Sequence, residues 1–283
     1  MSHILITGNS SYIGKSFAAY LRDNTAHSAE GISLRGHAWE ELSFVPYDTV
    51  FHAVGLTHVK ETPRNASEYY EINRDLTLAV ARKAKEEGVR QFIYMSSMSV
   101  YGMDEGVITP RTEPDPNTHY GRSKLDAETG LKKLEDESFR VCILRPPMVY
   151  GKGCKGNYAL LVTLIGKTPV FPEIGNRRSV LSIGNLCAFL TLAVDKGLSG
   201  LYFPQNRERV STTDLARWIA EGMGKKIMIS RAAGLLTKGL MLRSKTARKA
   251  FCSLSYEGTE TLDYCYCIED SRESVLRSVD KRR

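Results

Sequence analysis

The chain opens with an apolar strand, a glycine-containing turn and a helix, and this unit constrains the fold more than any other segment. The run His3-Ile4-Leu5-Ile6-Thr7 is followed by Gly8, Gly14 and an amphipathic stretch that ends near residue 22. Gly8 permits a tight turn, and Gly14 lets the helix pack closely on the strand. Backbone N–H groups at the start of such a helix face an anion such as a pyrophosphate. Because Ser11 stands where a middle glycine would ease the approach of a phosphate, a plain strand-to-helix turn is the alternative.

Strands and helices continue to alternate as far as residue 145. This alternation predicts an α/β fold of the Rossmann type, a doubly wound parallel sheet with helices on both faces. We expect a dinucleotide-binding domain of residues 1–145 plus about 182–203, and a smaller C-terminal substrate-binding lobe of residues 146–181 plus 204–283. The predicted strands are 3–7, 32–35, 48–55, 91–95, 140–144 and 201–203, and the predicted helices are 67–88, 120–136, 157–167, 185–196 and 211–223.

Composition limits the classes of partner. The 283 residues include 39 basic and 32 acidic side chains, a mild excess that suits an anionic small ligand such as a nucleotide. No dense basic tract favours nucleic acid, and no apolar run reaches the roughly 18 residues of a membrane span, so we expect neither partner. The six cysteines lack paired metal-binding spacing. We therefore expect free thiols, no metal site and a cytoplasmic protein without a signal peptide.

The pair Tyr120 and Lys124 is the main candidate for catalysis. Residues four apart in a helix stand on one face, and an ammonium group there favours the phenolate. The pair therefore predicts a tyrosine pKa below its usual value of about 10, in a range useful for a general base. The alternative is a solvated helix face. Serines 96, 97 and 99 follow a predicted strand and reach the edge where ligands bind in such sheets.

Two residues near predicted strand ends bear on the cofactor. Arg35 ends the predicted second strand, where an acid usually takes the ribose 2′-hydroxyl of NAD. An arginine there attracts a 2′-phosphate, so NADP is slightly favoured over NAD, although a solvated Arg35 is the alternative. His52 lies inside the apolar third strand and is interpreted as a core histidine whose polar atoms are paired.

Taken together, these blocks resemble the extended short-chain dehydrogenase/reductase superfamily and, within it, the UDP-glucose 4-epimerase-like group. The resemblance covers the chain to about residue 200. The blocks are Thr7-Gly8 with Ile13-Gly14, Asp48–Leu56, Tyr69–Asn73, Ser96–Gly102, Tyr120 with Lys124, and Leu144–Gly151. The last block and residues 156–158 are also similar to bacterial nucleotide-sugar 4-keto reductases of surface-polysaccharide pathways.

The resemblance implies roles for matching residues. Ser97 would hydrogen-bond the reacting sugar oxygen, Tyr120 would be the base, and Lys124 would hold the nicotinamide ribose. The implied cofactor-binding residues are Gly8, Ser10, Ser11, Tyr12, Ile13, Gly14, Arg35, Ala53, Val54, Gly55, Asn73, Tyr120, Lys124 and Pro147; the implied substrate-binding residues are Ser97, Ser99, Asn157 and Arg178. A homodimer through helices 67–88 and 120–136 is also implied.

Departures from the family pattern narrow the chemistry. Nucleotide-sugar dehydratases carry Asp-Glu directly after the active serine or threonine, whereas this chain has Met98 and Ser99, so dehydration is not expected. Met148 replaces an asparagine common in the epimerases. The leading interpretation is a UDP-hexose 4-epimerase with a transient 4-keto intermediate. The alternatives are an NADPH-dependent nucleotide-sugar 4-keto reductase and, remotely, a non-catalytic NADP-binding regulator, which would not need Ser97, Tyr120 and Lys124.

Overall fold

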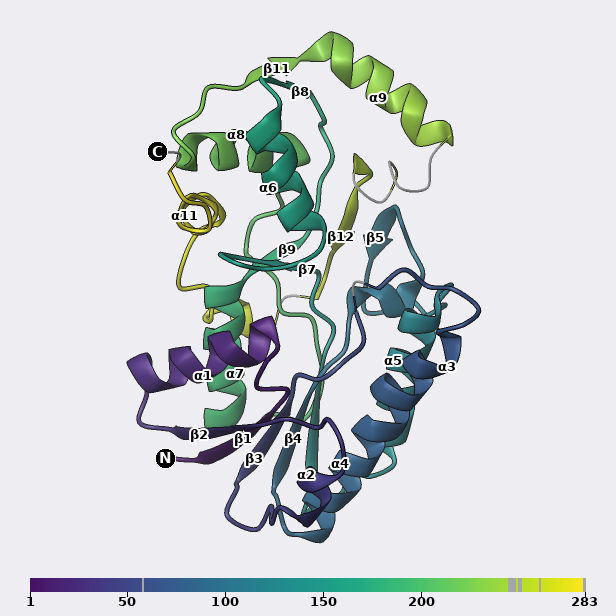
Figure 1. Cartoon of the computed structure of the whole chain (residues 1–283), viewed down its shortest axis with the longest axis vertical. Helices are drawn as coiled ribbons and strands as arrows, with labels where there is room; N and C mark the ends of the chain where they lie inside the picture. Colours follow the sequence, from purple (N-terminus) through teal and green to yellow (C-terminus); the bar gives the residue numbers. More distant parts are fainter. Residues whose placement is uncertain (58, 244–247, 249–250, 260, 282–283) are drawn as a thin grey trace. The chain divides into compact units, whose positions relative to one another are not determined.

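Six parallel strands form the sheet around which the first half of the chain folds. In the computed structural model, which describes residues 1–57, 59–243, 248, 251–259 and 261–281, the strand order is β10-β6-β4-β3-β1-β2 (Figure 1). Every neighbouring pair is parallel. The strands are β1 (His3–Thr7), β2 (Ser28–Ile32), β3 (Thr49–His52), β4 (Gln91–Met95), β6 (Arg140–Leu144) and β10 (Gly200–Tyr202). The order reverses between β1 and β3, so the predicted doubly wound fold is confirmed.

The chain divides into two units. The first contains residues 1–102, 113–146 and 187–204, and the second contains 103–112, 147–186 and 205–283. The sequence analysis had left 103–112 in the first domain. Whether the two units separate cofactor from substrate binding, as expected, stays a prediction. Among the described residues, no helix has both the length and the apolar character needed to cross a membrane.

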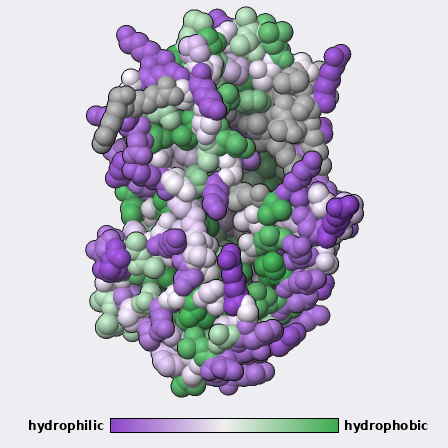
Figure 2. Space-filling model, viewed as in Figure 1, coloured by the Kyte–Doolittle hydropathy of each residue, from purple (hydrophilic) through white to green (hydrophobic). Residues whose placement is uncertain are grey.

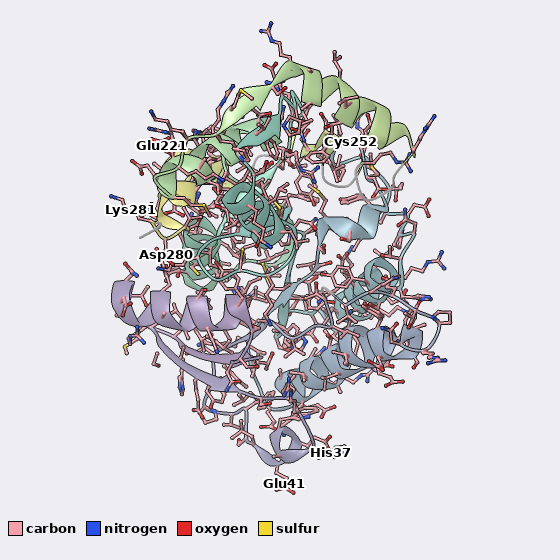
Figure 3. The ribbon with its side chains drawn as sticks, turned by 45° about the horizontal axis from the view of Figure 1, so that its top comes forward. His37, Glu41, Glu221, Cys252, Asp280 and Lys281 are labelled. Atoms are coloured by element: carbon pink, nitrogen blue, oxygen red, sulfur yellow. The ribbon has the colours of Figure 1, made fainter. Side chains whose placement is uncertain are left out.

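Helices cover both faces of the sheet. Helices α1 (Tyr12–Asn24) and α7 (Ile183–Asp195) lie on one side, and α4 (Leu76–Glu86) and α5 (His119–Lys132) lie on the other (Figure 1). The core between them is built from apolar side chains that include Val50, Val80, Phe92 and Leu131. The short helix α2 (Ala38–Glu41) buries Trp39, while the labelled His37 and Glu41 point away from the sheet (Figure 3).

The second strand is four residues earlier than predicted. Ile32-Ser33-Leu34 alternates like a half-buried strand, but β2 ends at Ile32 and Leu34 is buried in the core beyond it. The true strand lies at the edge of the sheet, where residues 28–31 are all exposed and carry no apolar periodicity. Arg35 therefore stands three residues beyond the strand and does not end it.

The long helix predicted over 67–88 is interrupted. It consists of α3 (Ala66–Tyr70), a π-helical turn (Glu71–Asp75) and α4. The interruption is invisible in the apolar pattern, and it carries the buried Asn73. Gly88, with a φ of 84°, follows the helix end in the left-handed conformation that glycine commonly adopts there.

The second unit consists of short parallel strand pairs and helices around its own core. The pairs are β7 (Met148–Tyr150) with β9 (Val180–Ser182), β8 (Val170–Pro172) with β11 (Met228–Ser230), and β5 (Gly106–Ile108) with β12 (Leu254–Tyr256). The helices are α6 (Asn157–Lys167), α8 (Thr212–Gly222), α9 (Arg231–Arg243) and α11 (Ser271–Arg277), with a 3₁₀ turn at Leu262–Tyr264. Ser211 and Asp214 form a capping box on α8. Tyr150, Tyr158 and Leu215 belong to the core.

His52 is a core histidine, as predicted. Its Nδ1 lies 2.9 Å from the Thr7 hydroxyl, and its Nε2 lies 3.0 Å from the Thr77 hydroxyl. Burial lowers the pKa of the ring to about 3, and the charge of Lys124 acts in the same direction. The imidazole is therefore neutral in the folded protein.

We expect the His52 ring to stay neutral down to about pH 4, because two hydroxyl partners satisfy the neutral form and nothing near it stabilises a charge. Nitrogen-15 NMR of the histidine rings across this pH range measures the protonation directly. The urea-unfolded chain, where histidines titrate near about 6.5, is the reference. A His52 resonance that titrated near that value in the folded protein would contradict the expectation.

Candidate active site

The turn after β1 is pressed against the end of β3. Gly8 has a φ of 83°, and a Cβ added there would lie 2.8 Å from Val54 Cγ2 and 3.2 Å from the carbonyl carbon of Ala53. A Cβ on Gly14 would lie 2.6 Å from the Gly8 carbonyl oxygen. Both glycines are therefore needed for the close approach of strand, turn and helix. The first turn of α1 begins at the point where the strand order reverses, the position of a dinucleotide site in such sheets.

Ser11 replaces the missing middle glycine with a different function. Its hydroxyl is the N-cap of α1 and accepts a hydrogen bond of 3.0 Å from the Gly14 N–H. This cap satisfies one of the backbone N–H donors in the first turn of α1, which begins with Tyr12 and Ile13. Ser10 precedes the cap residue. The contacts of these residues with a cofactor remain a prediction. So does the role of Arg35, which is exposed in the segment that follows β2.

Asn73 clamps the segment that follows β3. Its Oδ1 accepts a hydrogen bond of 2.7 Å from the Leu56 N–H, and its amide nitrogen donates to the Leu56 carbonyl at 3.3 Å and to the Ser123 hydroxyl at 3.0 Å. The side-chain amide is thus engaged by protein groups on both sides. Asn73 was predicted to bind cofactor. In the structure it positions the Ala53–Thr57 segment against α5, and direct contact with a cofactor remains a prediction.

Ser97 follows β4 and begins a 3₁₀ turn (Met98–Tyr101). Its hydroxyl accepts a hydrogen bond of 3.1 Å from the Ser99 N–H and lies 3.1 Å from the Ser99 hydroxyl. This turn packs on the start of α5, because a Cβ on Gly121 would lie only 2.6 Å from the Ser99 carbonyl oxygen. The glycine inside Tyr120-Gly-Arg-Ser-Lys124 therefore lets the serine turn approach the tyrosine helix.

Tyr120 stands in the first turn of α5, which is capped twice. The Thr118 hydroxyl accepts from the Gly121 N–H at 3.0 Å, and the Glu61 carboxylate accepts from the N–H groups of His119 and Tyr120 at 3.1 and 3.0 Å. These caps satisfy donors that the helix itself leaves unpaired. They hold Tyr120 near the carboxyl-terminal edge of the sheet, where Ser97 follows β4.

The side chains of Ser97 and Thr57 both lie where they lower the pKa of the Tyr120 hydroxyl. The structure thus brings together the predicted Ser97 and Tyr120 and adds Thr57, which sequence reasoning missed. The signal was available, because Thr57 lies two residues beyond Gly55 at the end of the third parallel strand, where ligands bind. Thr57 is exposed, whereas Ser97 and Tyr120 are half-buried.

The expected lowering of the tyrosine pKa is not found. Burial raises the pKa of Tyr120, while the hydrogen bonds from Ser97 and Thr57 act against this rise. Lys124 is not among the groups that lower the pKa of Tyr120. Its ammonium donates instead to the Met95 carbonyl at 2.9 Å and lies 4.7 Å from the centre of the Tyr94 ring. The correction has a simple cause: removal from water disfavours the charged form of both side chains.

Lys124 is nearly inaccessible and approaches the backbone at Gly55, where an added Cβ would lie 3.0 Å from its Nζ. Burial lowers the pKa of Lys124 to about 7, and the nearby Glu128 carboxylate opposes this change. Its charge is consequently sensitive to any group that enters the site near neutral pH.

Glu128 and Arg145 form a buried ion pair near Lys124. Glu128, one turn further along α5, accepts from Arg145 Nε at 3.0 Å and from its Nη2 at 2.5 Å, and it also bonds the Ser96 hydroxyl. Arg145 Nη1 donates to the Tyr101 hydroxyl at 2.8 Å. The side chains of Arg145 and Glu128 are only 5 % and 1 % exposed. Removing one partner of such a pair typically costs about 3–5 kcal/mol, so the pair firmly joins α5 to the ends of β4 and β6.

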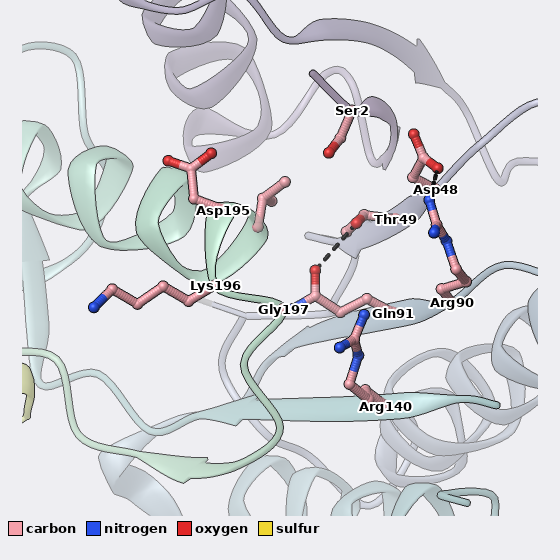
Figure 4. Close-up of a pocket in the computed structure, with 10 residues that line it drawn as sticks. Ser2, Asp48, Thr49, Arg90, Gln91, Arg140, Asp195, Lys196 and Gly197 are labelled. Carbon is pink, nitrogen blue, oxygen red and sulfur yellow. Dashed lines mark hydrogen bonds and ion pairs between the residues drawn. The ribbon is translucent and has the colours of Figure 1, made fainter. Parts of the chain in front are cut away.

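A polar cavity of about 200 Å³ lies elsewhere in the first unit (Figure 4). Asp48, Arg90 and Arg140 line it, and they precede or begin strands β3, β4 and β6. This is the amino-terminal edge of the sheet, opposite the edge that carries Ser97 and Tyr120. Its Asp48 is already paired with Arg90. Because doubly wound sheets bind their ligands at the carboxyl edge, we do not assign the active site to this cavity.

The remaining predicted residues lie in the second unit, apart from the exposed Ser99. Asn157 is the exposed first residue of α6, and Pro147 precedes β7. Arg178 is half-buried; its Nη1 donates to the Cys252 carbonyl at 2.7 Å, and burial lowers its pKa. Their predicted roles in holding substrate or cofactor remain predictions.

A doubly wound sheet with a serine, a tyrosine and a buried lysine at its carboxyl edge defines a class of dinucleotide-dependent oxidoreductases and epimerases. The model of the NAD dependent epimerase/dehydratase family matches residues 4–196. The chain belongs to this family, as the sequence resemblance predicted.

Similar proteins agree on the family and differ in their reactions. A UDP-glucose 4-epimerase of Vibrio cholerae is 33% identical over 196 residues, which are 65% of this chain and 60% of that protein. A GDP-6-deoxy-D-mannose reductase of Pseudomonas aeruginosa is 33% identical over 175 residues, 56% of this chain and 55% of that one. The chain thus spans between half and two thirds of the length of these relatives. The fold is similar to that of UDP-glucuronic acid 4-epimerase from Bacillus cereus in complex with NAD (TM-score 0.74, 18% identity, 98% and 96% of the two chains).

Replacing Lys124 by methionine should stabilise the protein most at low pH. The folded pKa of about 7 lies below the value of about 10.4 expected in the unfolded chain, so between these values the unfolded state binds the extra proton. The wild type therefore gains stability relative to Lys124→Met as the pH rises, by up to about 1.4 kcal/mol per pH unit.

Urea denaturation of both proteins between about pH 6 and pH 10 measures this difference in the free energy of unfolding. Lys132→Met, which alters an exposed lysine of the same helix, is the matched control. A stability difference between Lys124→Met and wild type that stayed constant with pH would contradict the burial of a shifted lysine.

Proposed function

We propose that this protein is an NAD(P)-dependent enzyme that carries out reversible hydride chemistry at C4 of a nucleotide-activated hexose. The observation that supports it best is the placement of Ser97 where it favours the phenolate of Tyr120, with the Lys124 side chain buried one helical turn away. Tyr120 is the proposed base, Ser97 positions the sugar oxygen, and Lys124 orients the cofactor ribose.

The residues present fit a dinucleotide. A Cβ at Gly8 or Gly14 would collide with neighbouring protein atoms, so the two glycines keep the turn after β1 tight. The first turn of α1 then offers backbone N–H donors to a pyrophosphate. Lys124 Nζ has the Met95 carbonyl as a hydrogen-bond acceptor and can donate to ribose hydroxyls as well. Arg35, in the segment after β2, would meet a 2′-phosphate and slightly favours NADP over NAD. A bound nicotinamide supplies the carrier that accepts and returns a hydride.

Tyr120 has to be a phenolate to take the proton of the C4 hydroxyl. Its raised pKa opposes this, whereas the hydrogen bonds from Ser97 and Thr57 favour the phenolate. A positive charge near the ring, such as that of an oxidised nicotinamide, would favour it further. We therefore propose that the base is activated when the cofactor is present, and that Thr57 shares with Ser97 the task of stabilising its charge.

Within this chemistry we favour a UDP-hexose 4-epimerase, because the match to the Vibrio cholerae 4-epimerase extends over the longer stretch. Arg35 and the equal identity to a GDP-6-deoxy-D-mannose reductase favour the alternative, an NADPH-dependent 4-keto reductase in surface-polysaccharide synthesis. Dehydration is not proposed, because Met98 and Ser99 cannot act as an acid and base pair. The predicted homodimer remains a proposal.

Tyr120→Phe should reduce turnover by at least about 100-fold, since it removes the proton acceptor, and should leave cofactor affinity within a few-fold of wild type. Tyr70→Phe is a matched control, because it deletes a hydroxyl that bonds His119, the neighbour of Tyr120. Turnover and cofactor titration are measured on the same preparations. Turnover unchanged in Tyr120→Phe would refute the catalytic assignment and favour a non-catalytic NADP-binding regulator.

The two reactions are separated by cofactor use. For an epimerase, we expect the purified protein to carry NAD or NADP and to interconvert UDP-glucose and UDP-galactose without added reductant, because hydride leaves and returns in one cycle. Chromatography of the released nucleotide and of the sugar products checks this. Stoichiometric oxidation of NADPH by a nucleotide 4-keto-6-deoxy sugar, with no interconversion, would instead establish the reductase.

A further inference from the structure

The basic excess of the chain is concentrated in one segment of the second unit. Residues 222–256 contain eight lysines and arginines and no aspartate or glutamate. The rest of the chain carries 31 basic and 32 acidic residues, so the surplus positive charge of the protein belongs to this segment. Its described part includes β11, helix α9 and β12. Such a run of one charge sign is suited to an anionic partner.

Helix α9 exposes two consecutive leucines. Leu235 and Leu236 are 70% and 78% exposed, and Met228 in the preceding strand is 61% exposed. In contrast, Gly234 faces the protein, where an added Cβ would lie 2.5 Å from the Glu173 carbonyl oxygen, and Thr237 on the same side is half-buried. For these two leucines the arrangement is the reverse of the usual one, in which an amphipathic helix buries its apolar residues.

Two contacts with Glu173 hold the start of α9 in place. The Glu173 N–H donates to the Ser230 carbonyl at 3.0 Å, just before α9 begins, and Arg231 Nε lies 3.2 Å from the Glu173 carboxylate. Arg231 and Arg243, at the two ends of α9, are both exposed. Over the part of the second unit labelled α9 in Figure 1, Figure 2 shows apolar side chains with polar ones beside them.

We propose that α9 is a docking surface for an anionic lipid bilayer, with Leu235 and Leu236 in the acyl boundary and the basic side chains among the headgroups. Apolar residues flanked by arginine and lysine, in a segment that itself contains no acid, are the composition of helices that lie in a membrane interface. At 13 residues α9 is too short to span. The expectation of no membrane partner rested on the absence of a spanning run, which surface association does not require.

The bilayer is favoured over a protein partner by the charge pattern. Like charges on both ends of the leucine face suit a uniformly negative surface, and leucines with no aromatic anchor among them lack the side chains that dominate protein interfaces. The inference is independent of the proposed sugar chemistry, since Leu235 and Leu236 take no part in the site formed by Ser97, Tyr120 and Lys124.

Sedimentation of the full-length protein with phosphatidylcholine vesicles, with and without phosphatidylglycerol, tests the proposal. We expect binding that requires phosphatidylglycerol and is lost at about 1 M salt, where charges are screened beyond about 3 Å. The double variant Leu235→Ser, Leu236→Ser should weaken binding by at least about tenfold, because two buried leucines are removed from the interface. The variant Leu160→Ser, which changes a leucine 69% exposed on α6, should bind like the wild type.

Circular dichroism and activity of the variants, which should match wild type, establish that they fold. Three results would overturn the proposal: no dependence on phosphatidylglycerol, equal binding by the double leucine variant, or tighter binding to duplex DNA than to the anionic vesicles. A wild-type dimer that becomes monomeric in the double leucine variant, without vesicle binding, would assign the face to a second copy of the chain instead.

Discussion

The buried ion pair between Glu128 and Arg145 is the interaction on which the candidate site depends. It joins α5, the helix of Tyr120 and Lys124, to the carboxyl ends of β4 and β6, and it reaches Ser96, which immediately precedes Ser97. A charged pair with so little exposure to water tolerates little displacement, because a separated charge would remain in a region of low dielectric. The relative placement of serine, tyrosine and lysine follows from it.

The site is also an example of opposed electrostatic effects. Burial gives Lys124 and Tyr120 a water-excluded setting, which strengthens any charge they meet there, but it also lowers the pKa of the lysine and raises that of the tyrosine. Hydrogen bonds from Ser97 and Thr57 reduce the cost for the phenolate without removing it. In the proposed mechanism, Tyr120 stays protonated until a cofactor or substrate supplies a positive charge, and this protects the site from side reactions.

Much of the fold could be predicted from the sequence, because buried parallel strands are short apolar runs and their helices are amphipathic. Strands β1, β3, β4 and β6 and helices α1, α5, α6, α7 and α8 appear where periodicity indicated, within a few residues. The failures have physical causes. Strand β2 is polar because it lies at a sheet edge, and the π turn at Glu71–Asp75 is a local change in the backbone hydrogen bonds of its helix. Neither the edge strand nor the π turn can be recognised from the hydropathy pattern of the sequence.

The sequence by itself determined the class of fold, the family, and the serine, tyrosine and lysine that form the candidate site, because their spacing is local and their motifs follow strand ends. Only the tertiary structure decided how these groups behave. Thr57 approaches Tyr120 from the segment that follows β3, Asn73 is engaged by Leu56 and Ser123, and Lys124 turns to the Met95 carbonyl. Hydrogen bonds between distant segments and the loss of water around a side chain depend on three-dimensional packing. For this reason the sequence predicted which residues meet, whereas their pKa values and the outward face of α9 required the folded chain.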